Sequence, residues 1–131
     1  VPFVDALTSI LDPNLPLSAL EWEEWGNPIT DPKVYRYMSE YSPYENVRPV
    51  DYPRIAAVTS FNDTRVLYVE PAKWVARLRD VNTGKYPLVF RTNMEAGHGG
   101  KSGRFQRYRE MAEYYAFMLD QLGVPAQPLA D

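Results

Sequence analysis

The sequence has no cysteine and only one histidine, His98, among its 131 residues. The lack of cysteine excludes disulfides, thiolate metal ligands and a cysteine nucleophile, and it fits a reducing compartment such as the cytoplasm. With a single histidine as well, a transition-metal site is not expected. We therefore expect a cytoplasmic protein that uses no metal and no other cofactor.

The sequence also lacks a long apolar run, a strong net charge and a signal peptide. No apolar run approaches the roughly 20 residues that a membrane span needs. The net charge of −3 argues against binding to nucleic acid or to an anionic membrane. The start, VPFVDAL, has no basic segment before a long apolar core, as a signal peptide would have. Neither nucleic acid nor a membrane is therefore expected as a partner.

The length and the first residues indicate one domain that belongs to something larger. A chain of 131 residues is enough for a single hydrophobic core. It begins with Val rather than Met, and VPFVDAL is typical of the end of a buried strand. Because a chain rarely begins inside a core, we expect either a piece of a longer protein or a chain from which a segment was removed.

Two short helices are predicted within the proline-rich stretch 12–53. The first covers Ser18–Trp25, where Ser18 followed by Glu21 matches a capping box. The second covers Pro32–Tyr41, because proline suits the first helical position after an aspartate cap.

From residue 54 onward the pattern predicts a strand, a helix, a second strand and a long helix. The apolar runs 54–61 and 86–90 are typical of buried parallel strands, and residues 71–80 and 104–122 show helical spacing. This order predicts an α/β fold with a parallel sheet covered by helices. In such sheets the functional loops follow the carboxyl ends of the strands, here residues 62–66 and 93–100.

These two loops carry Asp63 and His98, which meet if the two strands are neighbours. An aspartate bound to imidazole Nδ1 fixes the tautomer, which leaves the other nitrogen to take a proton from a nucleophile. Glycines around His98 leave the ring uncrowded and allow unusual backbone angles. The alternative is a surface histidine without a role and an aspartate that only caps a helix.

A hydrolytic triad also needs a nucleophile, which the sequence does not supply. In α/β-hydrolases a serine on a Gly-x-Ser-x-Gly turn precedes the acid and the histidine. No serine of this chain lies in such a turn, so the nucleophile is expected upstream of Val1. The stretch GHGGKSG is not a phosphate-binding loop, because the required first glycine falls on Glu95.

A cluster of carboxylates and one arginine are further candidates for substrate binding. LEWEEWGNP places Glu21, Glu23 and Glu24 around two tryptophans. Carboxylates beside aromatic rings suit a guanidinium or ammonium group, whereas the alternative is a solvated acidic helix. Arg65 lies two residues after the loop aspartate and can reach a substrate carbonyl, or it forms a surface ion pair.

Four long stretches resemble the C-terminal part of the oligopeptidase B group of serine peptidases, within the prolyl oligopeptidase family. The resemblance extends from VPFVDAL to about Leu119. The stretches are EWEEWGNP, YMSEYSPYENV, YPRIAAVTSFNDTRVLYVEPAKWVARLR and NMEAGHGGKSGRFQRYREMAEYYAF. The resemblance implies the C-terminal portion of an α/β-hydrolase fold, with parallel strands and flanking helices, and hydrolysis of short peptides after Arg or Lys.

The resemblance also implies a role for each candidate residue. Asp63 matches the acid and His98 the base of the catalytic triad, and Arg65 matches an arginine that holds a substrate carbonyl. Glu21 and Glu23 match the carboxylates that bind the basic side chain before the cleaved bond. On a regular helix, however, these two glutamates point about 200° apart and do not converge.

Residues 1–131 would then be the C-terminal part of a peptidase catalytic domain, without the serine turn and without the β-propeller of the family. The expected partners are short basic peptides and the upstream part of the same protein. The first strand should expose an unpaired edge unless another segment covers it. Two alternatives remain open: a prolyl oligopeptidase or acylaminoacyl-peptidase relative with another preference, and a non-catalytic interaction module.

Overall fold

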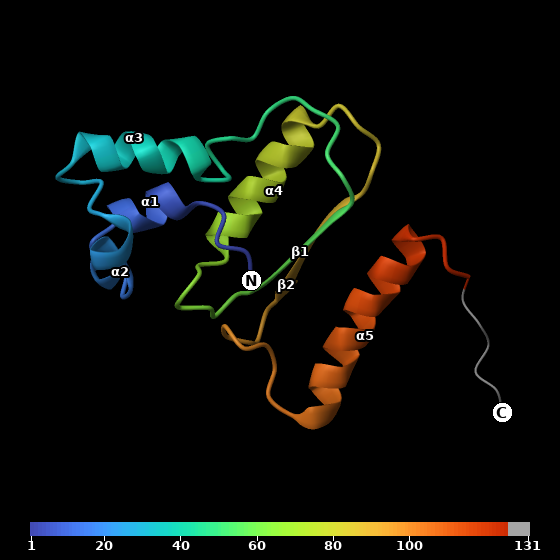
Figure 1. The fold of residues 1–131 in the computed structure, drawn as a ribbon. Helices are drawn as coiled ribbons and strands as arrows, with labels where there is room; N and C mark the ends of the chain where they lie inside the picture. The colour runs from blue at the N-terminus through green and yellow to red at the C-terminus, as the bar shows by residue number, and fades with distance from the viewer. Residues whose placement is uncertain (126–131) are drawn as a thin grey trace.

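Two parallel strands, β1 (Ile55–Ser60) and β2 (Leu88–Asn93), form the sheet of the computed structural model, which describes residues 1–125. The helix between them, α4 (Val69–Val81), packs on both strands. After β2 comes the long helix α5 (Arg104–Gln121), and α4 and α5 lie on opposite sides of the strands (Figure 1). The predicted order of strands and helices and the parallel sheet are therefore confirmed.

The second strand is shifted from its predicted position. It was expected over residues 86–90 and is observed at Leu88–Asn93. Pro87 has no N–H to donate to a neighbouring strand, so only its carbonyl takes part, accepting from Ile55 N at 3.0 Å. At the other end, Phe61 N donates to the Asn93 carbonyl at 2.8 Å. Pairing thus continues up to the loops that follow both strands.

The first residues do not form the strand end that VPFVDAL predicted. Residues 1–5 have no regular structure, and the chain then forms α1 (Ala6–Leu11). Leu7 and Ile10 are buried three residues apart, the spacing of one helix face. Over so short a run, periodicity does not separate a strand from a buried helix.

Three short helices make up a lobe beside the sheet (Figure 1). The helices α2 (Ser18–Trp25) and α3 (Pro32–Tyr41) have the predicted bounds, and both pack against α1. The cap of α3 is confirmed, since the Asp31 side chain accepts from Lys33 N at 2.8 Å. The capping box of α2 is wrong: Leu17 occupies the cap position, and Ser18 is already helical. Its hydroxyl instead donates to the Ser9 carbonyl on α1 at 2.6 Å.

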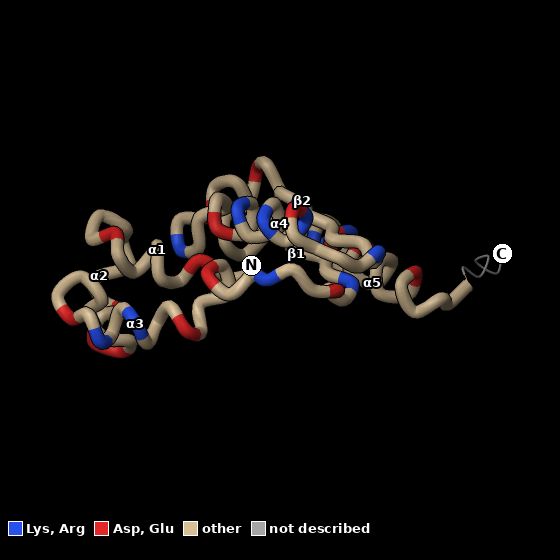
Figure 2. Tube along the Cα trace, turned by 90° about the horizontal axis from the view of Figure 1, so that it is seen from above, with Lys and Arg blue, Asp and Glu red and all other residues tan. Residues whose placement is uncertain are grey.

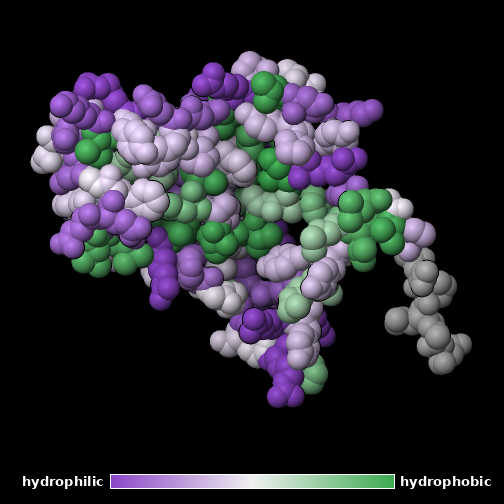
Figure 3. Space-filling view, viewed as in Figure 1, coloured by the Kyte–Doolittle hydropathy of each residue, from purple (hydrophilic) through white to green (hydrophobic). Residues whose placement is uncertain are grey.

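An open groove runs between β1 and α5. Within residues 1–125, β1 pairs with β2 alone, so its other edge is unpaired, as expected. The cavity there has a volume of about 840 Å³ and is lined by β1, the start of the chain and one face of α5. Figure 3 shows apolar surface gathered in the middle of this face, between the helical lobe and α5.

Acidic and basic residues are interspersed along the trace (Figure 2). No helix within the described residues 1–125 is long and apolar enough to cross a membrane.

The lobe has a small core, and a deletion within it should be strongly destabilising. Met38 is 1% exposed and packs with Leu7 and Ile10. We expect Met38→Ala to lower the free energy of unfolding of the chain by about 2–5 kcal/mol, because it leaves a cavity between α1 and α3. Leu20→Ala is the control on the same lobe, since Leu20 is 70% exposed and should change stability by about 0.5 kcal/mol or less. Urea unfolding followed by far-ultraviolet circular dichroism measures both, and equal losses would contradict this assignment of the core.

Candidate active site

The loops that follow β1 and β2 meet at the carboxyl edge of the sheet. The parallel register places Ser60 opposite Asn93, so both loops leave the sheet at the same level. Asn62 N donates to the Ala96 carbonyl at 3.2 Å and joins the two loops. His98 Nδ1 lies 2.9 Å from Asp63 Oδ2, the contact that the sequence order predicted.

Asp63 is the buried member of this pair, with none of its side chain exposed to solvent. While Oδ2 holds the ring, Oδ1 accepts from the backbone N–H groups of Arg65 at 2.9 Å and Val66 at 3.0 Å. Burial raises the pKa of Asp63, but the hydrogen bonds from Val66 N, Arg65 N and His98 together hold it below its ordinary value. The carboxylate therefore stays ionised, and it caps its own loop while it orients the histidine.

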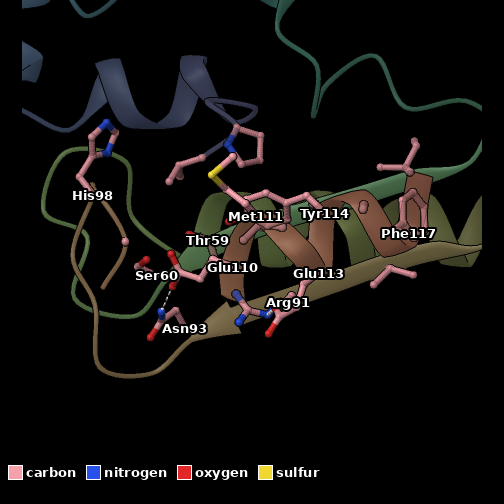
Figure 4. Close-up of a pocket in the computed structure, with 18 of the residues that line it drawn as sticks. Thr59, Ser60, Arg91, Asn93, His98, Glu110, Met111, Glu113, Tyr114 and Phe117 are labelled. Atoms are coloured by element: carbon pink, nitrogen blue, oxygen red, sulfur yellow. Dashed lines mark hydrogen bonds and ion pairs between the residues drawn. The ribbon is translucent and has the colours of Figure 1, made fainter. Parts of the chain in front are cut away.

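His98 is the exposed member, with 42% of its side chain accessible. Because Nδ1 is turned toward the aspartate, Nε2 remains for proton transfer to and from a reacting group. The ring lines both the groove beside β1 and a second cavity on the side of the helical lobe. In Figure 4 it stands at one end of the groove, with Phe117 toward the other.

A buried hydrogen-bond network supports the loop that carries the histidine. Asn93 Nδ2 donates to Glu110 Oε1 on α5 at 2.7 Å, and Asn93 Oδ1 accepts from Glu95 N at 3.2 Å (Figure 4). Gly100 N closes the loop by donating to the Gly97 carbonyl at 3.1 Å. Gly100 has a φ of 79°, and a Cβ there would lie 2.8 Å from Glu110 Oε2. A side chain at position 100 would be strained by this backbone angle and would crowd Glu110, whereas a Cβ at position 99 would meet no atom within 4 Å.

The second cavity brings three predicted site residues together. It has a volume of about 340 Å³ and lies between α1, α2 and the loop after β1. Glu21, Arg65 and His98 all line it. Glu23 does not line it and is exposed, because it lies about 200° around α2 from Glu21.

Two further residues of this cavity were missed by the sequence-based reasoning. Trp25 lines it and donates Nε1–H to Glu21 Oε2 at 2.5 Å. Its spacing could have identified it, since Ser18, Glu21 and Trp25 recur at the three- and four-residue intervals of one helix face. Glu70, on α4, also lines the cavity, and no local pattern in the sequence marks it.

Neither an ion pair of Arg65 nor a metal-ligand group is found in the structure of residues 1–125. The backbone N–H of Arg65 is bonded to the loop aspartate, and its side chain lines the second cavity. No three His, Asp or Glu side chains of the described part are grouped so that they could hold a metal ion.

The sequence matches the model of the prolyl oligopeptidase family over residues 1–125. It is 60% identical to dipeptidyl aminopeptidase BI of Pseudoxanthomonas mexicana and 58% identical to protease 2 of Moraxella lacunata, in each case over 97% of the chain. Among solved structures, oligopeptidase B of Leishmania major superposes with a TM-score of 0.91 at 42% identity over 98% of the chain. The corresponding enzyme of Trypanosoma brucei, with covalently bound antipain, gives 0.90 at 43%. The chain spans only 17–18% of the length of these four proteins.

The lowered pKa of Asp63 should make its contribution to stability depend on pH. A carboxyl whose pKa is lower in the folded state stabilises the fold above its ordinary pKa of about 3.9, and this contribution is lost as the pH falls through the folded value. We therefore expect the unfolding free energy difference between the wild type and Asp63→Asn to be largest above about pH 4 and to shrink on acidification. Urea titrations of both proteins between about pH 2 and 5 measure this difference.

The matched control is Glu24→Gln, which removes an exposed carboxyl on α2. Its difference from the wild type should stay near zero across the same range. A difference for Asp63→Asn that stays constant or grows toward low pH would contradict an ionised, hydrogen-bonded carboxylate.

Proposed function

The chain belongs to the prolyl oligopeptidase family and forms the C-terminal portion of an α/β-hydrolase fold, and we propose that it is the acid–base part of a serine oligopeptidase that cleaves short peptides after Arg or Lys. One observation carries this proposal. His98, hydrogen-bonded to Asp63, lines a cavity that the carboxylate of Glu21 also lines. The proposal assigns residues 1–131 to the C-terminal part of the catalytic domain of a longer protein.

In this mechanism a serine from the upstream part attacks the carbonyl of the bond to be cleaved. His98 takes the serine proton at Nε2 and then delivers it to the leaving amine. Asp63 keeps the ring in the required orientation and stabilises the imidazolium that forms. The buried, ionised state of this carboxylate supports that role. The unpaired edge of β1 beside the histidine is where the upstream part would complete the sheet.

The cavity beside α2 is the proposed site for the basic side chain. Glu21 would form a charge-assisted hydrogen bond with a guanidinium or ammonium group, and Trp25 would provide an aromatic wall. Arg65 borders the same cavity and would hold a carbonyl of the substrate backbone. The exposed position of Glu23 supports Glu21 as the direct ligand, with Glu23 outside the contact.

The alternatives predict other behaviour. An apolar preference before the cleaved bond would give no purpose to a carboxylate in the cavity. A non-catalytic module would show no activity even when it is joined to its upstream part. The relative named dipeptidyl aminopeptidase BI suggests that substrates with a free amino terminus should be tested beside blocked ones.

The first prediction from this proposal concerns turnover of a fluorogenic arginine peptide. The 131-residue chain alone should show none, whereas the full-length protein should be active. In the full-length protein His98→Ala should lower kcat by about 10⁴-fold or more, with little change in the affinity for an uncleaved arginine peptide. Glu95→Gln is the control in the same loop, since it keeps the backbone bond to Asn93 and alters only a side chain that forms an exposed ion pair with Lys101. Turnover by the chain alone that His98→Ala removes would show that a serine of this chain is the nucleophile.

The second prediction concerns the choice of the basic side chain. Citrulline has the shape of arginine without its charge, so the ratio of kcat/KM for the two substrates isolates the charge. We expect Glu21→Gln to lower this ratio by about 10- to 150-fold, the loss expected for one hydrogen bond to a charged group. Glu23→Gln, a substitution two residues along the same helix, should change the ratio by about twofold or less. Equal losses in the two variants would contradict the assignment of Glu21 alone as the ligand.

A further inference from the structure

The helix α1 lies between α4, the helix that follows the loop of Asp63, and α2, the helix that carries Glu21. On one side it is held by α4, which begins only six residues after Asp63. On the other side it contacts α2 through two hydrogen bonds, from Ser18 Oγ to the Ser9 carbonyl at 2.6 Å and from Trp22 Nε1 to the Ile10 carbonyl at 2.9 Å. The placement of α2 is therefore tied to that of α1.

Two residues of α4 hold α1 and its cap: Lys73 pairs with Asp5, the residue before α1, and Glu70 is the buried one. It is 3% exposed, and both of its carboxylate oxygens have partners on the neighbouring segment. Oε1 accepts from Ser9 Oγ at 2.5 Å, and Oε2 accepts from Asp5 N at 3.2 Å. Burial raises the pKa of Glu70, which the hydrogen bonds from Ser9 and Asp5 only partly offset. Burying a carboxyl group costs free energy that an apolar side chain would not cost, so we look for a role of Glu70 other than packing.

These bonds form a continuous path from α4 through α1 to α2. It runs from Glu70 to Ser9, then from the Ser9 carbonyl to the hydroxyl of Ser18, the first residue of α2. Ser18 and Glu21 are three residues apart and both face the second cavity. Together with the bond from Trp22, the bond from Ser18 holds α2 in the rotation in which Glu21 lines the cavity and Glu23 is exposed.

We propose that Glu70 is a positioning residue for charge selection: through Ser9 and Ser18 it holds α2 in the rotation that presents Glu21 to the basic side chain of the substrate. This inference rests on the proposed function. Although Glu70 borders the cavity, we assign it to holding α1 and not to binding the substrate, since each of its oxygens already accepts a hydrogen bond, from Ser9 and from Asp5. Its effect should fall on the discrimination between charged and uncharged substrates and leave the acid–base pair in place.

The test uses the full-length protein and the arginine and citrulline substrates. Glu70→Met keeps the length of the side chain but removes both acceptors. We expect it to lower the arginine-to-citrulline ratio of kcat/KM by about tenfold, mainly through a higher KM for arginine, with kcat/KM for citrulline within about twofold of the wild type. Ser18→Ala breaks the same path at its other end and should lower the ratio in the same direction. Since both variants interrupt one path, the double variant should lose much less than the product of the two single losses.

The matched control is Glu110→Met. Glu110 is another buried glutamate, 8% exposed, but it is bonded to Asn93 at the groove and does not line the second cavity. Whatever it does to stability or kcat, it should leave the arginine-to-citrulline ratio at the wild-type value. This control separates positioning of Glu21 from a general loss of packing.

Each outcome either supports the inference or overturns it. A wild-type ratio in Glu70→Met, or an equal loss for both substrates, would overturn it, while a reduced ratio in Glu21→Gln would still support the proposed function. If Glu70→Met does not fold, Ser18→Ala decides, and a wild-type ratio there overturns the inference. If the wild-type enzyme does not prefer arginine to citrulline, the proposed function fails, and the inference fails with it.

Discussion

The parallel register of β1 and β2 is the constraint on which the site depends. Because Ser60 pairs with Asn93, the two following loops begin at the same height, and Asp63 and His98 come within hydrogen-bonding distance. A slip by one residue would turn every side chain of the strand to the opposite face and move the loops apart. Backbone pairing therefore fixes the relative position of the two loops, and with it the distance between the side chains that they carry.

Two buried carboxyl groups show how surroundings decide what the same chemical group does. Asp63 and Glu70 are both almost inaccessible, yet the pKa of Asp63 is lowered and that of Glu70 is raised. In each case burial is the largest influence and raises the pKa. Asp63 overcomes it through two backbone N–H groups and a histidine, whereas Glu70 has weaker compensation from Ser9 and Asp5 and a neighbouring acid in Asp5. The surroundings of Asp63 suit an ionised carboxylate that orients a base, whereas those of Glu70 suit a hydrogen-bonded link between α4 and α1.

The sequence could predict what is local or repeats along one element. The helix Pro32–Tyr41 begins where proline and aspartate require it, and the order of strands and loops was enough to bring Asp63 to His98. It could not predict α1 as a helix, because six residues with buried positions show too little periodicity. Nor could it predict the path through Glu70, which joins residues 61 positions apart in the chain and exists only after α1, α2 and α4 have packed.

The unpaired edge of β1 also affects the tendency of this chain to aggregate. Its sequence, IAAVTS, contains no charge and no proline, the two features that commonly prevent strands from adding to an exposed edge. The neighbouring face of α5 carries large exposed apolar side chains, Met111, Tyr114 and Met118 among them. Kept apart from whatever covers this edge, the chain has a surface that favours association with other copies and aggregation. The strand that sets the geometry of the site therefore also presents an edge to which a strand of another copy can add.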